Sequence, residues 1–426
     1  IPNARHPLVP VVQGEHFMSQ GMVHDGKLLM RTNRDAPRFR IVRLNPAQPG
    51  EPSAWRDLIA ESEAPLDGWA VGSEGVVTHY LDDIRSRLYV HDDDGAVLRE
   101  IELPAPGAVR GLSADPSSAR VVFGFESYLD APSLLSATAD EVEVLSRVDS
   151  AFDASSFTTR QERVTSADGT EIPVTLIHSR DLDLDGELDG NTPVLLYGYG
   201  GFNVSLMPRF SRNALYWLER GGVYAVANLR GGSEFGEEWH RAGALENKPR
   251  VFEDFEAILS WLSTSGLSRP ERIAISGGSN GGLLMGAMLT RVPERFAAAA
   301  SYVGLYDMVR YHRFPPAELW VSEYGSAEDA ALFPVLHGYS PYHQVEAGTA
   351  YPATLIETAD HDGRVHWAHS TKFAAALQEA TSATRPIFFH MEREQGHGAG
   401  TRRSDQVTRY ARMFTFLEDE LQMRAP

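Results

Sequence analysis

Residues 277–282, GGSNGG, contain a serine in a context suited to nucleophilic catalysis. They lie between an apolar run typical of a strand, 272–276, and one typical of a helix, 281–292. A G-x-S-x-G pattern in this context predicts a sharp turn that projects Ser279, because glycines remove the Cβ clashes around it. The N–H of Asn280 can then donate to an oxyanion that forms beside Ser279. The alternative is a glycine-rich phosphate loop, but no G-K-[ST] and no following acidic ribose ligand support it.

A serine hydroxyl needs an oriented base, so an acid and a histidine are expected downstream. Asp362 lies 83 residues after Ser279, past a candidate strand, and His397 follows 35 residues later, past the next one. This order predicts that Ser279 attacks, that His397 acts as base and then as acid, and that Asp362 orients the imidazole.

The segment around Asp362 also offers rival interpretations. Asp360 lies two residues earlier and is a competing candidate for the acid. His361, His366 and His369 crowd the same segment, so a metal site is conceivable. Carboxylate and cysteine partners at ligand spacing are missing, which disfavours it. No metal and no organic cofactor is needed for serine chemistry, and we expect none.

The elements that must position these residues alternate along the chain from about residue 159 onward. Apolar strands are followed by amphipathic helices, which predicts a doubly wound, mostly parallel sheet over 159–426. The candidate strands are 174–178, 193–197, 223–229, 272–276, 298–303, 353–357 and 386–390. The candidate helices are 253–265, 281–292, 367–380 and 403–421.

Residues 1–158 have a different sequence pattern. Short runs of alternating apolar and polar residues are separated by Asp-Gly and Asn turns. Such runs predict antiparallel sheets, and we mark three loosely similar units near 12–58, 66–104 and 108–150. Propeller blades are the natural interpretation, but a propeller closes with about four to eight blades. Either the remaining blades are on another chain or the blade interpretation is wrong. The opening residue is Ile1, so we expect the start to be processed or incomplete.

Composition excludes several classes of protein. The formal net charge is −19 and the chain has only three lysines, so nucleic acid is not an expected partner. Because no run of about 18 apolar residues occurs, no membrane span is expected. The absence of cysteine excludes disulfides and thiolate nucleophiles. It fits a cytoplasmic location, and a periplasmic one equally well.

Six blocks in the second half resemble the prolyl oligopeptidases, a family of serine peptidases. They are LLYGYGGFN (195–203), ANLRGGSEFGEEWHRAG (227–243), GGSNGGLL (277–284), LWVSEYG (319–325), TADHDGRV (358–365) and GHGAG (396–400). The resemblance implies an α/β-hydrolase domain preceded by part of a β-propeller. It also implies that an N-terminal fragment of the same protein completes the propeller, since the family has about seven blades.

The resemblance also assigns residues. Ser279, Asp362 and His397 fall on the family's catalytic triad, and Tyr199 matches its hydroxyl donor to the oxyanion, partnering the Asn280 N–H. An apolar proline pocket and an arginine that hydrogen-bonds the substrate backbone are implied at further positions. The pocket positions are Phe202, Trp320, Tyr324 and Val365, and the arginine is Arg364.

Together with the resemblance, these features predict a serine endopeptidase that cleaves short proline-containing peptides after proline. An oligopeptidase of the same family that cuts after Arg or Lys is one alternative, but the matched pocket positions are aromatic and neutral. An exopeptidase or esterase on the same domain is another. A non-catalytic propeller scaffold would require a missing triad member, and none is missing.

Overall fold

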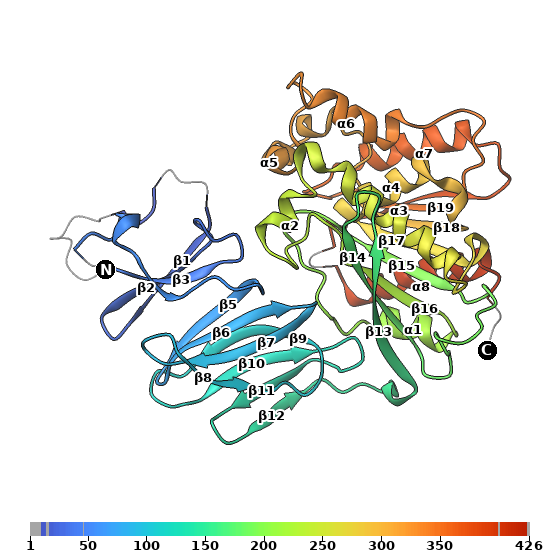
Figure 1. Cartoon of the computed structure of the whole chain (residues 1–426). Helices are drawn as coiled ribbons and strands as arrows, with labels where there is room; N and C mark the ends of the chain where they lie inside the picture. Colours follow the sequence, from blue (N-terminus) through green and yellow to red (C-terminus); the bar gives the residue numbers. More distant parts are fainter. Residues whose placement is uncertain (1–9, 14–16, 46, 399–400, 424–426) are drawn as a thin grey trace. The chain divides into compact units, whose positions relative to one another are not determined.

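The computed structural model describes residues 10–13, 17–45, 47–398 and 401–423 (Figure 1). The chain forms two compact units. Unit 1 comprises residues 1–151 together with two short segments from later in the chain, 207–210 and 234–238. Unit 2 comprises residues 152–206, 211–233 and 239–426.

Unit 1 contains three four-stranded antiparallel sheets within the described residues. The first is β1 (Ser19–His24), β2 (Lys27–Thr32), β3 (Arg40–Leu44) and β4 (Arg56–Ile59). The second is β5 (Leu66–Gly72), β6 (Gly75–Asp82), β7 (Arg85–His91) and β8 (Val97–Ile101). The third is β9 (Ala108–Ala114), β10 (Val121–Glu126), β11 (Ser133–Ala137) and β12 (Val142–Arg147). Each sheet is a meander, and the three sheets match the three units marked in the sequence, except that β4 ends one residue beyond the first unit.

Tight turns and apolar faces explain this arrangement. Asp25 and Gly26 both have positive φ, 47° and 72°, as the two central residues of a type I′ hairpin between β1 and β2 require. Buried apolar side chains of the first and second sheets form one cluster, and those of the second and third form another. Each sheet therefore packs its apolar side chains against those of its neighbour.

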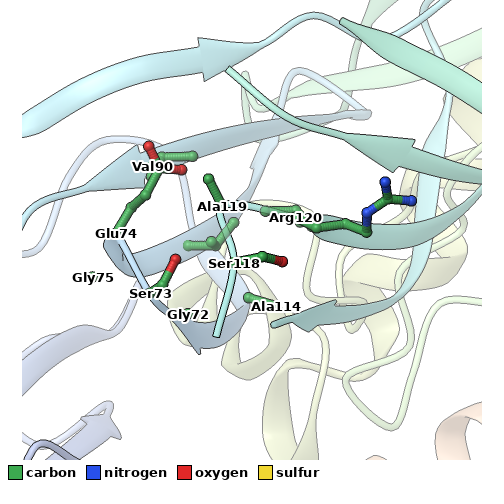
Figure 2. A pocket seen from close by; sticks show the side chains of 11 residues that line it. Gly72, Ser73, Glu74, Gly75, Val90, Ala114, Ser118, Ala119 and Arg120 are labelled. Carbon is green, nitrogen blue, oxygen red and sulfur yellow. The ribbon is translucent and has the colours of Figure 1, made fainter. Parts of the chain in front are cut away.

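The second and third sheets also meet at their turns (Figure 2). The β5–β6 turn, residues 72–75, and residues 118–121 line a small hollow there. The Ser73 N–H donates to the Asp115 carbonyl at 3.1 Å. Arg99 pairs in bidentate fashion with Glu74, with both N–O distances at 2.8 Å. The hollow is a gap between packed blades rather than a site with converging polar groups.

Unit 2 is built on an eight-stranded sheet in the order β13-β14-β16-β15-β17-β18-β19-β20. β13 and β14 pair antiparallel, β14 pairs antiparallel with β16, and the remaining pairs are parallel. The strands are β13 (Phe157–Thr165), β14 (Glu171–Ser179), β15 (Val194–Gly198), β16 (Val223–Ala227), β17 (Ile273–Gly278), β18 (Ala298–Tyr302), β19 (Ala353–Ala359) and β20 (Ile387–Glu392). All seven candidate strands are confirmed, and β13 is an additional strand.

Helices cover both faces of this sheet. The helices are α1 (Arg212–Glu219), α2 (Glu237–Arg241), α3 (Pro249–Thr264), α4 (Asn280–Arg291), α5 (Val321–Tyr324), α6 (Phe333–Tyr339), α7 (Ala368–Ala380) and α8 (Arg403–Glu420). The apolar sides of α3, α4 and α7 form one buried cluster with the sheet, and α1 and α8 form another. Leu196 faces the first cluster and Leu195 the second, as the alternation of side chains along a strand requires.

The four candidate helices correspond to α3, α4, α7 and α8, whereas α1 was not expected. A signal for α1 exists in the sequence. Ser211 is its N-cap and accepts a hydrogen bond from the Ala214 N–H at 3.4 Å, and apolar residues follow at helical spacing. No helix within the described part of the chain is long and apolar enough to cross a membrane.

Truncation of a core residue tests the packing of α3 against the sheet. Ile258 of α3 is fully buried in the first cluster, so Ile258→Ala is expected to lower the free energy of unfolding by about 2–5 kcal/mol. Val407 of α8 is 62% exposed, so Val407→Ala is a matched control that changes it by less than about 0.5 kcal/mol. Urea denaturation compares the two, and equal losses would contradict the described core.

Candidate active site

The turn between β17 and α4 holds Ser279 in a strained backbone conformation. Its φ is 59° and its ψ is −118°, a combination that a residue with a side chain rarely adopts. The Ser279 N–H donates to the Tyr302 carbonyl of β18 at 2.8 Å. A Cβ on Gly277 would lie 2.5 Å from the Gly281 oxygen, and one on Gly282 would lie 2.5 Å from the Gly304 Cα. Glycine is therefore required on both sides of the serine.

Asp362 and His397 meet in loops that follow β19 and β20. The Asp362 Oδ2 lies 2.7 Å from the His397 Nδ1, and the Asp362 side chain is fully buried. The Asp362 Oδ1 accepts hydrogen bonds from the N–H groups of Arg364 and Val365 at 2.8 and 2.9 Å. Three donors thus fix the carboxylate, and the carboxylate in turn orients the imidazole.

The two loops and the serine turn belong to one edge of the sheet. β17, β19 and β20 run parallel, and Ser279, Asp362 and His397 each follow the carboxyl end of one of them. The carboxyl edge of a parallel sheet is where such side chains can converge. Among the described residues, no side-chain hydrogen bond joins Ser279 to His397. Catalytic hydrogen bonds are often long without substrate and tighten when it binds.

Tyr199, directly after β15, contributes a phenol beside the serine. Burial raises its pKa to about 12, and the nearby charge of Glu323 adds to the rise. A hydrogen bond with the Ser279 side chain and the charge of Arg364 act in the opposite direction. The phenol is therefore protonated at neutral pH and can donate to negative charge that develops next to Ser279.

Three aromatic side chains, Phe202, Trp320 and Tyr324, lie close together. The ring of Phe202 contacts those of Trp320 and Tyr324 edge to face, with centroids 6.2 and 5.4 Å apart. Tyr324 and Val365 are buried in one apolar cluster, against which Phe202 and Trp320 pack. Arg364 is exposed, yet its charge reaches the Tyr199 hydroxyl. The structure thus brings together Phe202, Trp320 and Tyr324, three of the four residues that the resemblance assigned to a pocket.

The side chain of Asn280 has a function that the sequence did not indicate. Its Nδ2 donates to the Tyr199 carbonyl at 2.6 Å, and its Oδ1 accepts from the Tyr324 hydroxyl at 2.8 Å. One amide therefore links the turn at Ser279, the loop at 199–203 (the Tyr199 loop) and Tyr324 of the aromatic side chains. The sequence indicated a role only for the backbone N–H of Asn280.

A group of buried charges beneath the Tyr199 loop was also missed. Lys248 and Glu323 are 1% and 3% exposed, and they pair with an N–O distance of 3.2 Å. His240 lies 2.8 Å from the other carboxylate oxygen of Glu323. Lys248 is one of only three lysines, and Glu323 stands within the apolar segment LWVSEYG, so both were visible as exceptions in the sequence.

The rival residues have other surroundings. Asp360 lies 3.8 Å from Arg393 and 3.5 Å from His361 rather than against His397. The buried His369 accepts from the backbone N–H groups of Tyr306 and Asp307, at 3.2 and 3.1 Å. In the described part of the chain, the groups with ligand spacing are His24, Asp25 and Asp93, and Glu357, His390 and Glu392. Neither group contains the histidines suggested for a metal site.

The raised pKa of Tyr199 gives a pH prediction. Because burial disfavours the phenolate, Tyr199 is expected to stay protonated up to about pH 11, above the range in which an exposed tyrosine ionises. Titration of tyrosinate absorbance in the parent and in Tyr199→Phe measures this. The absorbance curves of the two proteins should coincide below about pH 11. If the variant instead lacks one tyrosine that ionises near the ordinary pKa in the parent, the described burial of Tyr199 is contradicted.

Comparison with known proteins supplies the family. The model of the prolyl oligopeptidase family matches residues 208–424, and that of the prolyl oligopeptidase N-terminal β-propeller domain matches 2–146. A prolyl endopeptidase of Elizabethkingia miricola is 38% identical over 414 residues, which cover 96% of this chain and 58% of the relative. A prolyl endopeptidase of Dictyostelium discoideum is 33% identical over 416 residues, covering 94% and 54%.

Solved structures agree with these relatives. One from a structural and mechanistic analysis of two prolyl endopeptidases superposes with a TM-score of 0.93 at 36% identity, covering 97% of this chain and 61% of that one. Prolyl oligopeptidase B of Galerina marginata, bound to a 25mer macrocyclization substrate, gives 0.91 at 28% identity, covering 98% and 58%. The chain thus spans less than two thirds of the length of these relatives. It belongs to the prolyl oligopeptidase family of serine peptidases.

Proposed function

We propose that the protein is a serine endopeptidase that hydrolyses short peptides on the carboxyl side of proline through an acyl-enzyme. The observation that carries this proposal is the convergence at one sheet edge. Ser279, the Asp362–His397 pair and Tyr199 lie there beside a set of aromatic side chains. Family membership supports the serine chemistry, and the names of the relatives support proline as the preferred residue.

The reaction follows from the groups present. The Ser279 oxygen attacks the scissile carbonyl while its proton passes to the Nε2 of His397, and Asp362 stabilises the resulting imidazolium. The carbonyl oxygen becomes an oxyanion, to which the Tyr199 hydroxyl and the Asn280 N–H donate. The C–N bond then breaks, and His397 returns its proton to the leaving amine. Water attacks the acyl-enzyme by the same route and releases the acid and Ser279.

The aromatic set accounts for the selectivity that we propose. A pyrrolidine ring is rigid and apolar and carries no N–H, so flat aromatic walls suit it. Phe202, Trp320, Tyr324 and Val365 supply such walls, and Arg364 is the donor to the substrate backbone. Glu323 is a carboxylate close to this set, but Lys248 compensates its charge, and its other oxygen is engaged by His240. A basic side chain in the pocket would therefore have no free carboxylate among these residues.

We also propose that a further, N-terminal part of the same protein completes the propeller. The described residues of unit 1 form three four-stranded sheets, fewer than the four to eight blades with which a propeller closes, and the matched relatives are longer than this chain. We propose that the closed propeller restricts access to the serine, so that short peptides are cleaved and folded proteins are not.

Hydrolysis of blocked fluorogenic dipeptides tests the substrate class. With the full-length protein, kcat/KM for a dipeptide ending in proline is expected to exceed that for Ala or Arg by at least about tenfold, because only proline fills the aromatic walls. The Ser279→Ala variant should abolish all cleavage above background. A preference for Arg would move the function to the oligopeptidases that cut after basic residues, and cleavage that survives Ser279→Ala would contradict the mechanism.

The role of Asp362 can be tested without any peptide. A small phosphonofluoridate phosphonylates an activated serine, and intact-protein mass spectrometry follows the reaction. Asp362→Asn is expected to lower the rate about 10⁴-fold, because the amide cannot hold the imidazole in the required tautomer. Asp360→Asn is the matched control, two residues away and not in contact with His397, and should stay within about threefold of the parent. Equal losses in both variants would contradict the assignment of Asp362.

A further inference from the structure

The buried lysine beneath the Tyr199 loop is the starting point. The Lys248 Nζ donates to the Gly200 carbonyl at 2.9 Å and to the Glu323 Oε1 at 3.2 Å, and it lies 5.2 Å from the centre of the Tyr324 ring. Burial lowers the pKa of Lys248, and the Glu323 charge opposes this shift. Removing an ammonium from water costs several kcal/mol, so a lysine in this position needs close partners.

Glu323 connects the same lysine to the pocket. Its Oε1 accepts from the Phe202 N–H at 3.0 Å as well as from Lys248, and its Oε2 lies 2.8 Å from the His240 Nε2. Burial alone would raise the pKa of Glu323, but Lys248, His240 and the Phe202 N–H hold it below its ordinary value. The carboxylate is therefore charged, and it is engaged on both oxygens.

The loop that these two residues hold needs external support. Gly200, Phe202 and Asn203 have φ values of 63°, 57° and 58°. The left-handed conformation is unfavourable for a residue with a side chain. On the other side, the Asn203 N–H donates to the Gly231 carbonyl at 3.0 Å. A Cβ on Gly201 would lie 2.8 Å from the Lys248 Nζ, so the lysine is packed directly against the loop.

We propose that Lys248 and Glu323 are positioning residues, which hold the loop at 199–203 so that the Tyr199 hydroxyl stays at Ser279 and Phe202 stays in the aromatic wall. This role rests on the proposed function. Lys248 fixes the carbonyl of Gly200, next to Tyr199, and Glu323 fixes the N–H of Phe202. One buried ion pair thus sets the geometry of the oxyanion donor and of the pocket together.

Charge balance is the second part of the role. The carboxylate of Glu323 lies close enough to Tyr199 to contribute to the rise of its pKa. The same charge would oppose negative charge on the substrate oxygen if it were not compensated. Lys248 supplies a compensating charge inside the protein, where water cannot screen it.

A double-mutant cycle with Tyr199→Phe tests whether the pair acts through Tyr199. The measured quantity is the rate constant for phosphonylation of Ser279 in the full-length protein. In this step an O–P bond forms at Ser279, the P–F bond breaks, fluoride leaves and His397 takes the serine proton. Lys248→Met leaves Glu323 buried without its main partner and can unfold the chain. The principal variant is therefore Lys248→Met/Glu323→Gln, which removes both charges and retains an acceptor for the Phe202 N–H.

We expect Lys248→Met/Glu323→Gln to lower the rate by about tenfold or more in the parent, but by less than about threefold in the Tyr199→Phe background. Lys372→Met/Asp307→Asn is the matched control. It removes another lysine–carboxylate pair of unit 2, whose described contacts include Arg310 and the Tyr342 ring. The control should leave the phosphonylation rate within about threefold in both backgrounds, even if thermal stability falls.

The outcomes separate the two proposals. A Ser279-dependent reaction with an equal fold-loss in both backgrounds means that the pair acts independently of Tyr199, and this overturns the positioning role alone. A loss of less than about threefold in the parent background also overturns it. A parent chain whose labelling is unchanged by Ser279→Ala overturns the proposed function and the positioning role with it.

Discussion

The positive φ of Ser279 is the constraint on which the rest of unit 2 depends. A serine with this backbone persists only where its surroundings over-determine it, and here β17, β18 and α4 do so. Gly277 and Gly282 let the backbones of the turn and of the neighbouring loop approach more closely than a Cβ would allow. The parallel strands then place the other loops at the same edge. The packing around the sheet thus maintains the strained backbone conformation of Ser279.

At this edge of the sheet, hydrogen bonds and ion pairs within the protein hold the polar side chains in place. Asp362 is held by two backbone N–H groups and an imidazole, and Asn280 uses both ends of its amide. Glu323 is held by a lysine, a histidine and a backbone N–H. Preorganised groups of this kind need no rearrangement when charge develops, which is where their catalytic value lies.

The sequence predicted those features that depend on local patterns. Alternating runs with Asp-Gly turns predicted the three blades, and apolar strands followed by amphipathic helices predicted the parallel sheet. The turn around Ser279 could be predicted because its glycines are adjacent in the sequence. The contacts of Lys248 with Gly200 and Glu323 span 48 and 75 residues, and no local pattern encodes contacts of that kind. The helix α1 was missed for another reason, since its cap and spacing were present but not recognised.

Unit 1 is formed by three separate segments of the chain, and this has a consequence for how the protein is synthesised. Met207 and Phe235 pack with Leu81, Ile84 and Ala108, although they lie far along the chain from the three blades. The chain leaves unit 1 at Ala151 and returns to it twice, at 207–210 and 234–238. During synthesis on the ribosome, Leu81, Ile84 and Ala108 therefore lack part of their packing until first Met207 and then Phe235 have emerged. Four strands of the sheet of unit 2, β13 to β16, are therefore synthesised before all the segments of unit 1 are present.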